Sequence, residues 1–529
     1  MALVTPAELG LPKKFKEFRS QQRTAIEKIA QSDKKVILLQ APTGSGKTLL
    51  MAALAKYMKT QILYTCHTKQ LQDQVTADFP YAVELKGRAN YPCLKGGKFT
   101  CNECTKKGGS TNSRCRDCKY DCEARFPTHK REVCPCEANC PFLLQKAEAE
   151  AAEMAVLNTP LFLNEVNFTH SFSDWPWVVL DEGDLTENAL MSFIGVSITE
   201  YQIKQLHLMP PKAKTVAEAW LTWIREQAMP AIQFRLQQIA GSGDFFELRE
   251  KTELERLEHK VSFLSNENLN NWVFLPEEKS WTFKPVFISR YARHRLWDHA
   301  KRFLVMSGTI ISSYQFARDL GLKDDECEFI DLPSTFPPGR RPIYFKPAAD
   351  MAHKNKDTAW PRIVAALDQI LEKHSREKGI IHTVSYPLAR YIAGHSIYKA
   401  RMLEHDPSNR ISTLERFKAD PTPVVIVSPS MDRGVDLPYD FCRFIVIVKV
   451  PFPNLGDTQI SRRLYSADDG PLWYAVQTIR TIIQASGRGM RAEDDYCATY
   501  ILDEQFRRLY AQYNHLFPSW WREAISQIE

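Results

Sequence analysis

The run Gln40–Thr48 constrains this chain more than any other feature of its sequence. It follows the apolar segment 36–39 and leads into the apolar segment 49–55, so the predicted order is strand, glycine-rich turn, helix. In that context the N–H groups of the turn and the helix N-terminus can bind a polyphosphate. The sequence therefore predicts a phosphate-binding loop made of Pro42, Thr43, Gly44, Ser45, Gly46, Lys47 and Thr48.

An acidic pair downstream fits the same site. Asp181 and Glu182 follow an apolar strand predicted at 177–180. We expect Lys47 to reach the β- and γ-phosphates of ATP and the Thr48 hydroxyl to bind Mg²⁺. Asp181 would also hold Mg²⁺, and Glu182 would polarise the attacking water. Acidic pairs are common at strand ends, so this prediction depends on the phosphate-binding loop upstream.

A basic run near the C-terminus, Gln484–Arg491, completes the predicted catalytic set. Arg488 and Arg491 are three residues apart and therefore share one face of a helix. Such a pair can stabilise charge on the γ-phosphate in the transition state, as an arginine finger does. The alternative is a solvated basic helix end.

Composition limits the class of protein. The chain has 529 residues, 44% hydrophobic and 25% charged, which predicts a globular protein of three or four domains. A formal charge of +6 permits a nucleic-acid partner without requiring one. No apolar run approaches a membrane span, and Met1–Pro6 lacks a signal-peptide pattern, so we expect a cytoplasmic protein without a membrane partner.

Nine of the 13 cysteines fall between Cys93 and Cys140. In a reducing compartment such a cluster indicates metal ligation rather than disulfides, with unligated thiols as the alternative. The pairs Cys101/Cys104 and Cys115/Cys118 are also spaced as in a zinc ribbon. The residues alone do not choose among these ligand sets.

Patterning along the chain predicts an α/β fold with two insertions. The first α/β domain is expected at 1–90, 141–198 and 283–338, and a second at 339–529 after a proline-rich hinge. The cysteine-rich module at 91–140 interrupts the first. So does a segment at 199–282, where helices are predicted at 216–238 and 246–264 and strand signals are weaker.

The ordered motifs resemble one family over nearly the whole chain, the XPD/DinG-type iron–sulfur helicases of superfamily 2. The matching segments are Phe18–Gln22, the phosphate-binding loop, Thr68–Gln74, Lys86–Cys93, Cys140–Phe142, Asp181–Glu182, Ser307–Thr309, Ser334–Pro337, His382–Tyr386, Met431–Leu437, Lys449–Pro453 and Gln484–Arg491. The resemblance implies two RecA-like motor domains, each a parallel sheet flanked by helices. It implies that the inserted modules are an iron–sulfur domain and an arch-like helical domain.

The resemblance also implies ligands. Arg19 and Gln22 match the adenine-side element, and Gly434, Asp436 and Gln484 match motifs of the ATP site. Four thiolates would hold one [4Fe–4S] cluster. The first choice is Cys93, Cys101, Cys104 and Cys140, and the alternative ligands, or a second site for Zn²⁺, are Cys115, Cys118, Cys134 and Cys136.

Two positions depart from the family pattern. Asp184 stands where the family's Asp-Glu-Ala-His box has histidine, which puts inter-domain coupling through that residue in question. Arg433 replaces an acidic residue before Gly434 and could contact a DNA phosphate or alter inter-domain coupling.

The predicted function is an ATP-dependent DNA helicase in repair or replication, monomeric and acting on single-stranded and forked DNA. Its 5′→3′ polarity comes from the resemblance. One rival is a nucleic-acid-dependent ATPase that removes proteins or R-loops without processive unwinding. The other is a metal-ribbon DNA-binding protein with a degenerate phosphate-binding loop.

Overall fold

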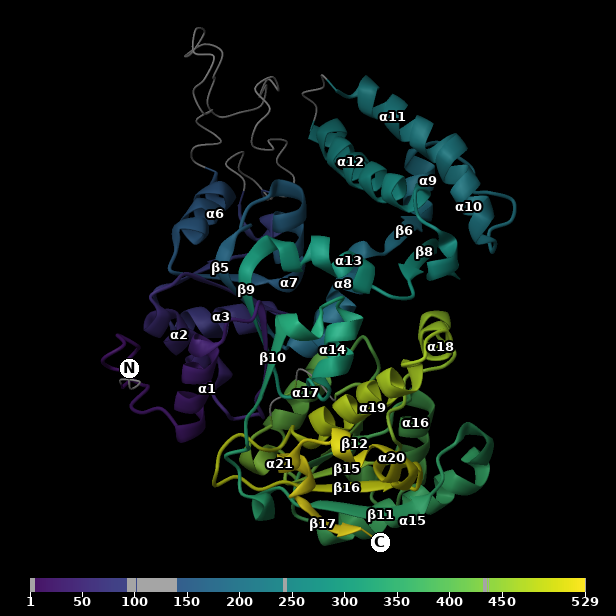
Figure 1. Ribbon diagram of the computed structural model, residues 1–529. Coiled ribbons are helices and arrows are strands. Elements are labelled where there is room, and N and C mark those ends of the chain that lie inside the picture. The colour runs from purple at the N-terminus through teal and green to yellow at the C-terminus, as the bar shows by residue number, and fades with distance from the viewer. Residues whose placement is uncertain are drawn as a thin grey trace.

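The computed structural model describes residues 5–92, 101, 140–240, 245–431, 435 and 437–528 (Figure 1). Within these ranges the chain forms two parallel seven-stranded sheets and one small antiparallel sheet. Several predicted site residues lie outside the described residues: Cys93, Cys104, Cys115, Cys118, Cys134, Cys136, Arg433, Gly434 and Asp436. None of the helices in the described ranges is both long and apolar enough to cross a membrane.

The first sheet has the strand order β10-β1-β9-β5-β2-β4-β3. Its strands are β1 (Val36–Gln40), β2 (Ile62–Cys66), β3 (Ala82–Leu85), β4 (Met154–Asn158), β5 (Trp175–Asp181), β9 (Ala300–Ser307) and β10 (Cys327–Asp331). The helices that accompany it are α1 (Ser20–Gln31), α2 (Lys47–Met58), α3 (Lys69–Asp78), α6 (Pro141–Ala151), α7 (Thr159–Asn164), α8 (Thr186–Ile194), α13 (Ser289–Arg295) and α14 (Ser313–Asp319).

Both faces of this sheet are covered, which explains its near-continuous apolar strands. Along β1, Leu38 packs in one core cluster while Ile37 and Leu39 pack in the other, because successive side chains of a strand point to opposite faces. All five residues of β1 are buried. The sheet therefore holds the residues that follow β1, β5 and β9 at one fixed edge.

The second sheet has the order β13-β14-β12-β15-β16-β11-β17. Its strands are β11 (Ile343–Ala349), β12 (Gly379–His382), β13 (Met402–Glu404), β14 (Val425–Ser428), β15 (Phe444–Ile447), β16 (Ala498–Asp503) and β17 (Ile525–Ile528). Its helices are α15 (Lys356–Lys373), α16 (Tyr386–His395), α17 (Arg410–Ala419), α18 (Thr458–Tyr465), α19 (Gly470–Ser486), α20 (Gln505–Tyr513) and α21 (Ser519–Arg522).

The predicted helical insertion contains more strand than expected. Its helices are α9 (Glu200–Gln205), α10 (Ala217–Trp223), α11 (Met229–Gln238) and α12 (Phe245–Ser265), with a π-helical turn at Ile224–Ala228 between α10 and α11. They stand on an antiparallel sheet of β6 (Val196–Thr199), β8 (Ser280–Pro285) and β7 (Trp272–Pro276). The prediction of weak strand signals was therefore wrong at β7 and β8, where alternate residues of β8 are buried.

Aromatic packing holds the insertion to its small sheet. The rings of Trp220 and Trp281 lie 4.5 Å apart, and those of Phe274 and Phe283 lie 4.7 Å apart. These side chains belong to the same core cluster as one face of the first sheet. The insertion and the first motor domain thus share a hydrophobic core.

Candidate active site

The phosphate-binding loop lies between β1 and α2, as predicted. Its Gly44 has a φ of +80°, and a Cβ there would come within 2.1 Å of the Phe336 ring. The N-cap of α2, Gly46, also has a left-handed backbone, and α2 starts at Lys47. The free N–H groups of this helix start therefore point into the loop, where they can bind phosphate oxygens.

Arg19 and Gln22, predicted beside the adenine, brace the loop in this structure. The Gln22 side-chain amide donates to the Ser45 carbonyl at 2.8 Å, and the Arg19 guanidinium donates to the Gly44 carbonyl. Gln22 also accepts from the Arg19 backbone at 2.9 Å. These contacts fix the loop, and the adenine role stays a prediction.

Lys47 and Asp181 are the residues predicted to contact the phosphates and Mg²⁺. The Lys47 ammonium is 3.4 Å from the Ala41 carbonyl of its own loop. Asp181 is 8% exposed; its Oδ2 accepts from the Tyr64 hydroxyl, and its Oδ1 has no hydrogen-bond partner among the described residues. Burial and the Asp181 carboxylate raise the pKa of Tyr64, so that hydroxyl keeps its proton. A buried carboxylate oxygen left over in this way fits a role as a ligand of Mg²⁺.

Glu182 has an unusual backbone conformation. Its φ is +50° and its ψ is 43°, in the left-handed region that residues other than glycine rarely adopt. Such strain concentrates at functional sites. Glu182 lines a cavity together with Lys47 and Arg488, which supports its predicted role beside the γ-phosphate.

This cavity, here called the cleft cavity, lies between the two motor domains and has a volume of about 240 Å³. From the first domain it is lined by Pro42, Thr43, Lys47, Glu182, Asp184, Ser307, Gly308 and Thr309; from the second, by Gln484, Gly487, Arg488 and Arg491. The cavity thus joins the predicted Lys47 and Glu182 of one half with the predicted arginines of the other, whereas Thr48 and Asp181 are not part of its lining. Thr48 lies next to Lys47 in the first turn of α2.

The two predicted arginine fingers are held by backbone carbonyls. Arg488 donates from Nε to the Gln484 carbonyl at 2.9 Å and from Nη1 to the Val435 carbonyl at 3.3 Å. Arg491 donates to the Gly487 and Met490 carbonyls. Both lie beyond the end of α19 at Ser486, so the prediction that they share one face of a helix was wrong, although both line the cleft cavity opposite the phosphate-binding loop.

Asp184, the departure from the family's histidine, connects the two domains. It is 4% exposed. The Ser307 hydroxyl donates to its Oδ1 at 2.6 Å, and the Gln484 amide donates to its Oδ2 at 2.9 Å. Gln484 also donates to the Thr309 hydroxyl at 2.8 Å, and Arg480 donates to the Thr309 carbonyl at 3.1 Å. An aspartate at this position thus maintains a link between the end of β5, the end of β9 and α19.

Sequence reasoning missed several residues of the cleft cavity. Phe336, Arg341, Trp520 and Trp521 also line it. Arg341 donates to the Phe336 carbonyl at 3.0 Å and to the Trp520 carbonyl, and burial lowers its pKa. Arg341 lies within the predicted proline-rich hinge at 337–342, which could have pointed to it. The two tryptophans come from the C-terminal α21, and no motif marks them.

Two of the nine clustered cysteines are described. Cys101 is buried, and its Sγ lies 3.8 Å from the Sγ of Cys140 at the N-cap of α6. In the described ranges, no three side chains of His, Cys, Asp or Glu are gathered as a metal site would need. The pairing of Cys101 with Cys140 is consistent with the first-choice ligand set.

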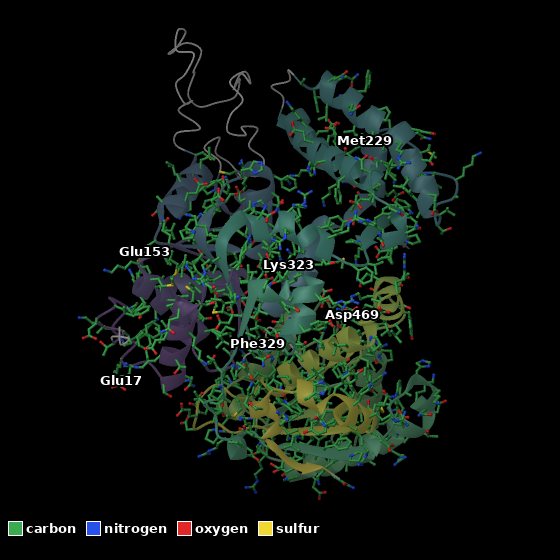
Figure 2. The ribbon with its side chains drawn as sticks, viewed as in Figure 1. Glu17, Glu153, Met229, Lys323, Phe329 and Asp469 are labelled. Atoms are coloured by element: carbon green, nitrogen blue, oxygen red, sulfur yellow. The ribbon has the colours of Figure 1, made fainter. Side chains whose placement is uncertain are left out.

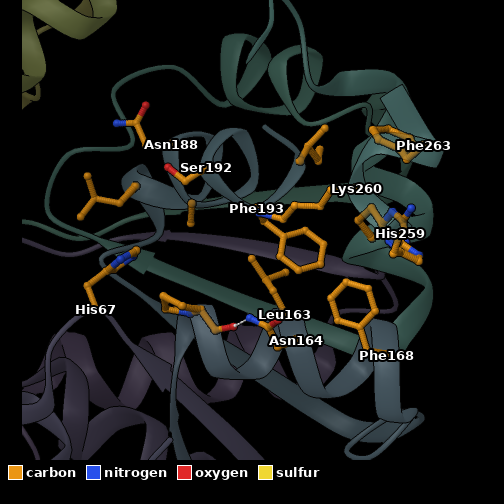
Figure 3. A pocket seen from close by; sticks show the side chains of 15 residues that line it. His67, Leu163, Asn164, Phe168, Asn188, Ser192, Phe193, His259, Lys260 and Phe263 are labelled. Carbon is orange, nitrogen blue, oxygen red and sulfur yellow. Dashed lines mark hydrogen bonds between the residues drawn. The ribbon is translucent and has the colours of Figure 1, made fainter. Parts of the chain in front are cut away.

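A second cavity, here called the insertion cavity, has a volume of about 480 Å³ (Figure 3). It lies between the first motor domain and α12 of the insertion. Its lining includes the aromatic rings of Phe168, Phe193 and Phe263 and the basic side chains of His67, His259, Lys260 and Arg295. Burial, followed by the charge of Arg256, lowers the pKa of Lys260.

Comparisons with known proteins agree with this arrangement. The Helicase C-terminal domain family matches residues 371–524, and the family described as Type III restriction enzyme, res subunit, matches residues 15–120. A solved XPD helicase structure aligns with a TM-score of 0.65 and 18% identity, covering 96% of this chain and 98% of that one.

Curated relatives are distant. The ATP-dependent DNA helicase YoaA of Escherichia coli is 21% identical, over 92% of this chain and 91% of its own length. The Fanconi anemia group J protein homolog of Gallus gallus is 26% identical over 20% of this chain, a match that spans only 9% of that protein. With the motif order and the cleft cavity, these matches support the resemblance of the chain to XPD/DinG-like superfamily 2 helicases.

Proposed function

We propose that this protein is an ATP-dependent DNA helicase that moves 5′→3′ on single-stranded DNA and separates duplexes during repair or replication. The observation that carries the proposal is the cleft cavity. Lys47 and Glu182 of one RecA-like domain and Arg488 of the other line it. A nucleotide bound there contacts both domains, so its hydrolysis changes how the domains are held together.

Each residue of the cleft has a role in this proposal. Lys47 neutralises the β- and γ-phosphates, while Thr48 and Asp181 hold Mg²⁺, which stabilises charge on the transferring phosphoryl group. Glu182 orients the attacking water. Arg488, with Arg491 beside it, stabilises the charge that develops in the transition state.

The insertion cavity supports a path for the strand. Aromatic rings offer stacking surfaces to any base, and cations bind the phosphate backbone without reading sequence. Lys260 and Arg295 supply positive charge next to Phe193 and Phe263. We propose that single-stranded DNA passes this cavity and that the insertion acts as the arch against which a forked duplex is split.

The cysteine-rich module would carry a metal that orders the segment between Cys93 and Cys140. A [4Fe–4S] cluster held by Cys93, Cys101, Cys104 and Cys140 is our first proposal. Two thiolates on one tetrahedral ion with bonds of about 2.3 Å lie about 3.8 Å apart. The spacing of Cys101 and Cys140 has that value, which favours testing Zn²⁺ as the alternative ion. Iron and zinc counts after anaerobic purification separate the two.

The rival proposal is a DNA-dependent ATPase that removes proteins or R-loops without processive unwinding. Strand displacement measured beside ATP hydrolysis distinguishes it. A duplex with only a 5′ single-stranded tail should be unwound, and a duplex with only a 3′ tail should not. ATP hydrolysis that is stimulated by single-stranded DNA, without strand displacement from either substrate, would favour the rival. A preparation that binds DNA but hydrolyses no ATP would favour the remaining hypothesis, a metal-ribbon DNA-binding protein with a degenerate phosphate-binding loop.

A further inference from the structure

Helix α18 of the second motor domain contacts the base of the insertion. Its Arg462 donates from Nη1 to the Trp272 carbonyl at 2.6 Å and from Nη2 to the Asn270 carbonyl. One turn earlier, the Gln459 amide donates to the Val286 carbonyl at 3.2 Å. These contacts go to the backbone around β7 and β8, so they fix the position of the small sheet and not one of its side chains.

The next residue of α18 points to the first motor domain. Arg463 is 2% exposed and donates to Asp319 of α14 at 2.7 Å and to Asp469 at 2.9 Å. Asp469 also accepts from the amide of Gln315, in α14, at 2.8 Å. The guanidinium of Arg463 lies over the Trp473 ring, 5.2 Å from the ring centroid. Figure 2 labels Asp469 beside α18, where the two motor domains meet. Breaking such a buried charge network is costly, so it behaves as a fixed point.

Helix α19 continues from this fixed point to the nucleotide. It starts at Gly470, directly after Asp469, and ends at Ser486 in the lining of the cleft cavity. At 1.5 Å per residue its 17 residues span about 25 Å. A Cβ at Gly470 would lie 1.9 Å from the Leu464 carbonyl of α18. The two helices are therefore packed too closely to move separately (Figure 1).

We propose that α18 and α19, residues 458–486, form a rigid arm that transmits nucleotide binding to the insertion. This α18–α19 arm has the cleft cavity at one end, the insertion base at the other, and the Arg463 network as its pivot. When the cleft closes on ATP, the Gln484 end moves, and α18 on the other side of the pivot moves the small sheet. Helix α12 follows, which changes the insertion cavity at His259 and Lys260.

The inference rests on the proposed helicase function and is tested with two distance measurements in the full chain. Because the chain has 13 cysteines, spin labels are placed through an unnatural amino acid. The first pair, at the exposed residues Lys28 and Lys418, reports the distance between motor domains. The second pair, at Lys28 and the exposed Gln237 of α11, reports the position of the insertion. Each is measured without nucleotide and with ADP–beryllium fluoride.

In the wild-type chain we expect nucleotide to change both distances. Arg462→Ala should leave the first change intact and remove the second, because only the contact with the insertion is lost. Gln459→Ala should reduce the second change in part. Arg416→Ala, which removes an exposed arginine of α17, should alter neither.

The outcomes separate the inference from the function on which it rests. A second distance that still changes in Arg462→Ala overturns the α18–α19 arm, as does a wild-type insertion that stays still while the cleft closes. If the first distance fails to change in the wild type, closure of the motor domains is itself wrong. Activity gives an independent reading: Arg462→Ala should lose about tenfold in unwinding rate, the value of one charged hydrogen bond, with single-strand-stimulated hydrolysis within about twofold of wild type.

Discussion

The cleft cavity and the insertion cavity lie in the same molecule and are built differently. In the cleft cavity, polar side chains hold one another across the domain boundary, as Asp184 does with Gln484. In the insertion cavity, aromatic rings such as Phe193 stand next to cations such as Lys260. Fixed polar groups select one ligand geometry, whereas rings and cations accept many. The difference fits our proposal that ATP is hydrolysed in the first cavity and that single-stranded DNA passes through the second.

The largest expected difference between the two cavities is in the effect of Lys47→Ala. We expect ATP hydrolysis to fall by more than about 10³-fold, because the main cation at the β- and γ-phosphates is lost. Single-strand affinity, measured by fluorescence anisotropy, should stay within about twofold. Lys28→Ala on the exposed face of α1 is the charge-matched control and should change neither quantity. Near-normal turnover in Lys47→Ala would remove the phosphate-binding loop from the mechanism.

The second prediction tests the other side of the cleft. Arg488→Ala should lower turnover by about 10³-fold, the usual value of an arginine finger. Arg488→Lys should recover little, because lysine lacks the planar fork that the Gln484 and Val435 carbonyls orient. If Arg491 shares the role, the double alanine variant should lose less than the two single losses combined. A loss of two- or threefold in Arg488→Ala would make the arginine structural.

The third prediction concerns the link between domains. Asp184→Ala should reduce DNA-stimulated hydrolysis by about tenfold, since it leaves the Ser307 hydroxyl and the Gln484 amide without their shared acceptor. Hydrolysis without DNA should fall less, because Lys47 and Asp181 are untouched. Asp184→His, which restores the family's residue, tests whether the local packing is tuned to aspartate. Equal losses with and without DNA would argue against a coupling role.

The fourth prediction addresses the insertion cavity. Lys260→Ala should weaken single-strand binding by a few fold and reduce the slope of log affinity against log salt by about one. Hydrolysis without DNA should be unchanged. Lys279→Ala, in the exposed turn between β7 and β8, is the control. An unchanged salt slope would place the strand elsewhere.

The same two regions differ in what the sequence could predict. The strands β1, β5 and β9 were predictable because buried parallel strands are continuous apolar runs that end in motif residues. The phosphate-binding loop followed from local order alone. The short strands β7 and β8 were missed, since they are half-exposed and lie between long amphipathic helices. The two seven-stranded sheets confirm the expected RecA-like architecture. The fold also agrees with that of the solved XPD helicase structure.

The contacts between the domains could not be read from the sequence. The Gln484–Asp184 hydrogen bond joins positions 300 residues apart, and Arg463 meets Asp319 across 144. No periodicity connects such positions, and the replacement of histidine by Asp184 gave no sign of its new partners. Trp473 is likewise buried at this boundary, and its indole N–H donates to Glu187 at 3.3 Å.

The smallest expected effect is a pH dependence at Glu187, a residue of α8 whose carboxyl group accepts from Trp473 and Gln477 of α19. Burial, followed by the charge of Asp319, raises the pKa of this carboxyl to about 7, against the opposing charges of Arg463 and Arg480. The folded state therefore holds a proton that the unfolded chain releases near pH 4.5. The stabilisation is complete below that value and is lost as the pH rises through about 7.

Glu187→Gln keeps a neutral acceptor for Trp473 and Gln477 at every pH. Its thermal unfolding midpoint should match the wild type at pH 4, below the unfolded pKa, and exceed it at pH 8.5, by on the order of a few degrees at most. Glu218→Gln, at an exposed position, should show no such pH-dependent difference from the wild type. If the unfolding midpoints of the wild type and Glu187→Gln differ by the same amount at both pH values, Glu187 does not bind a proton on folding. Repulsion between the carboxylates of Glu187 in α8 and Asp319 in α14 then has no effect on the stability of the contact between the two motor domains.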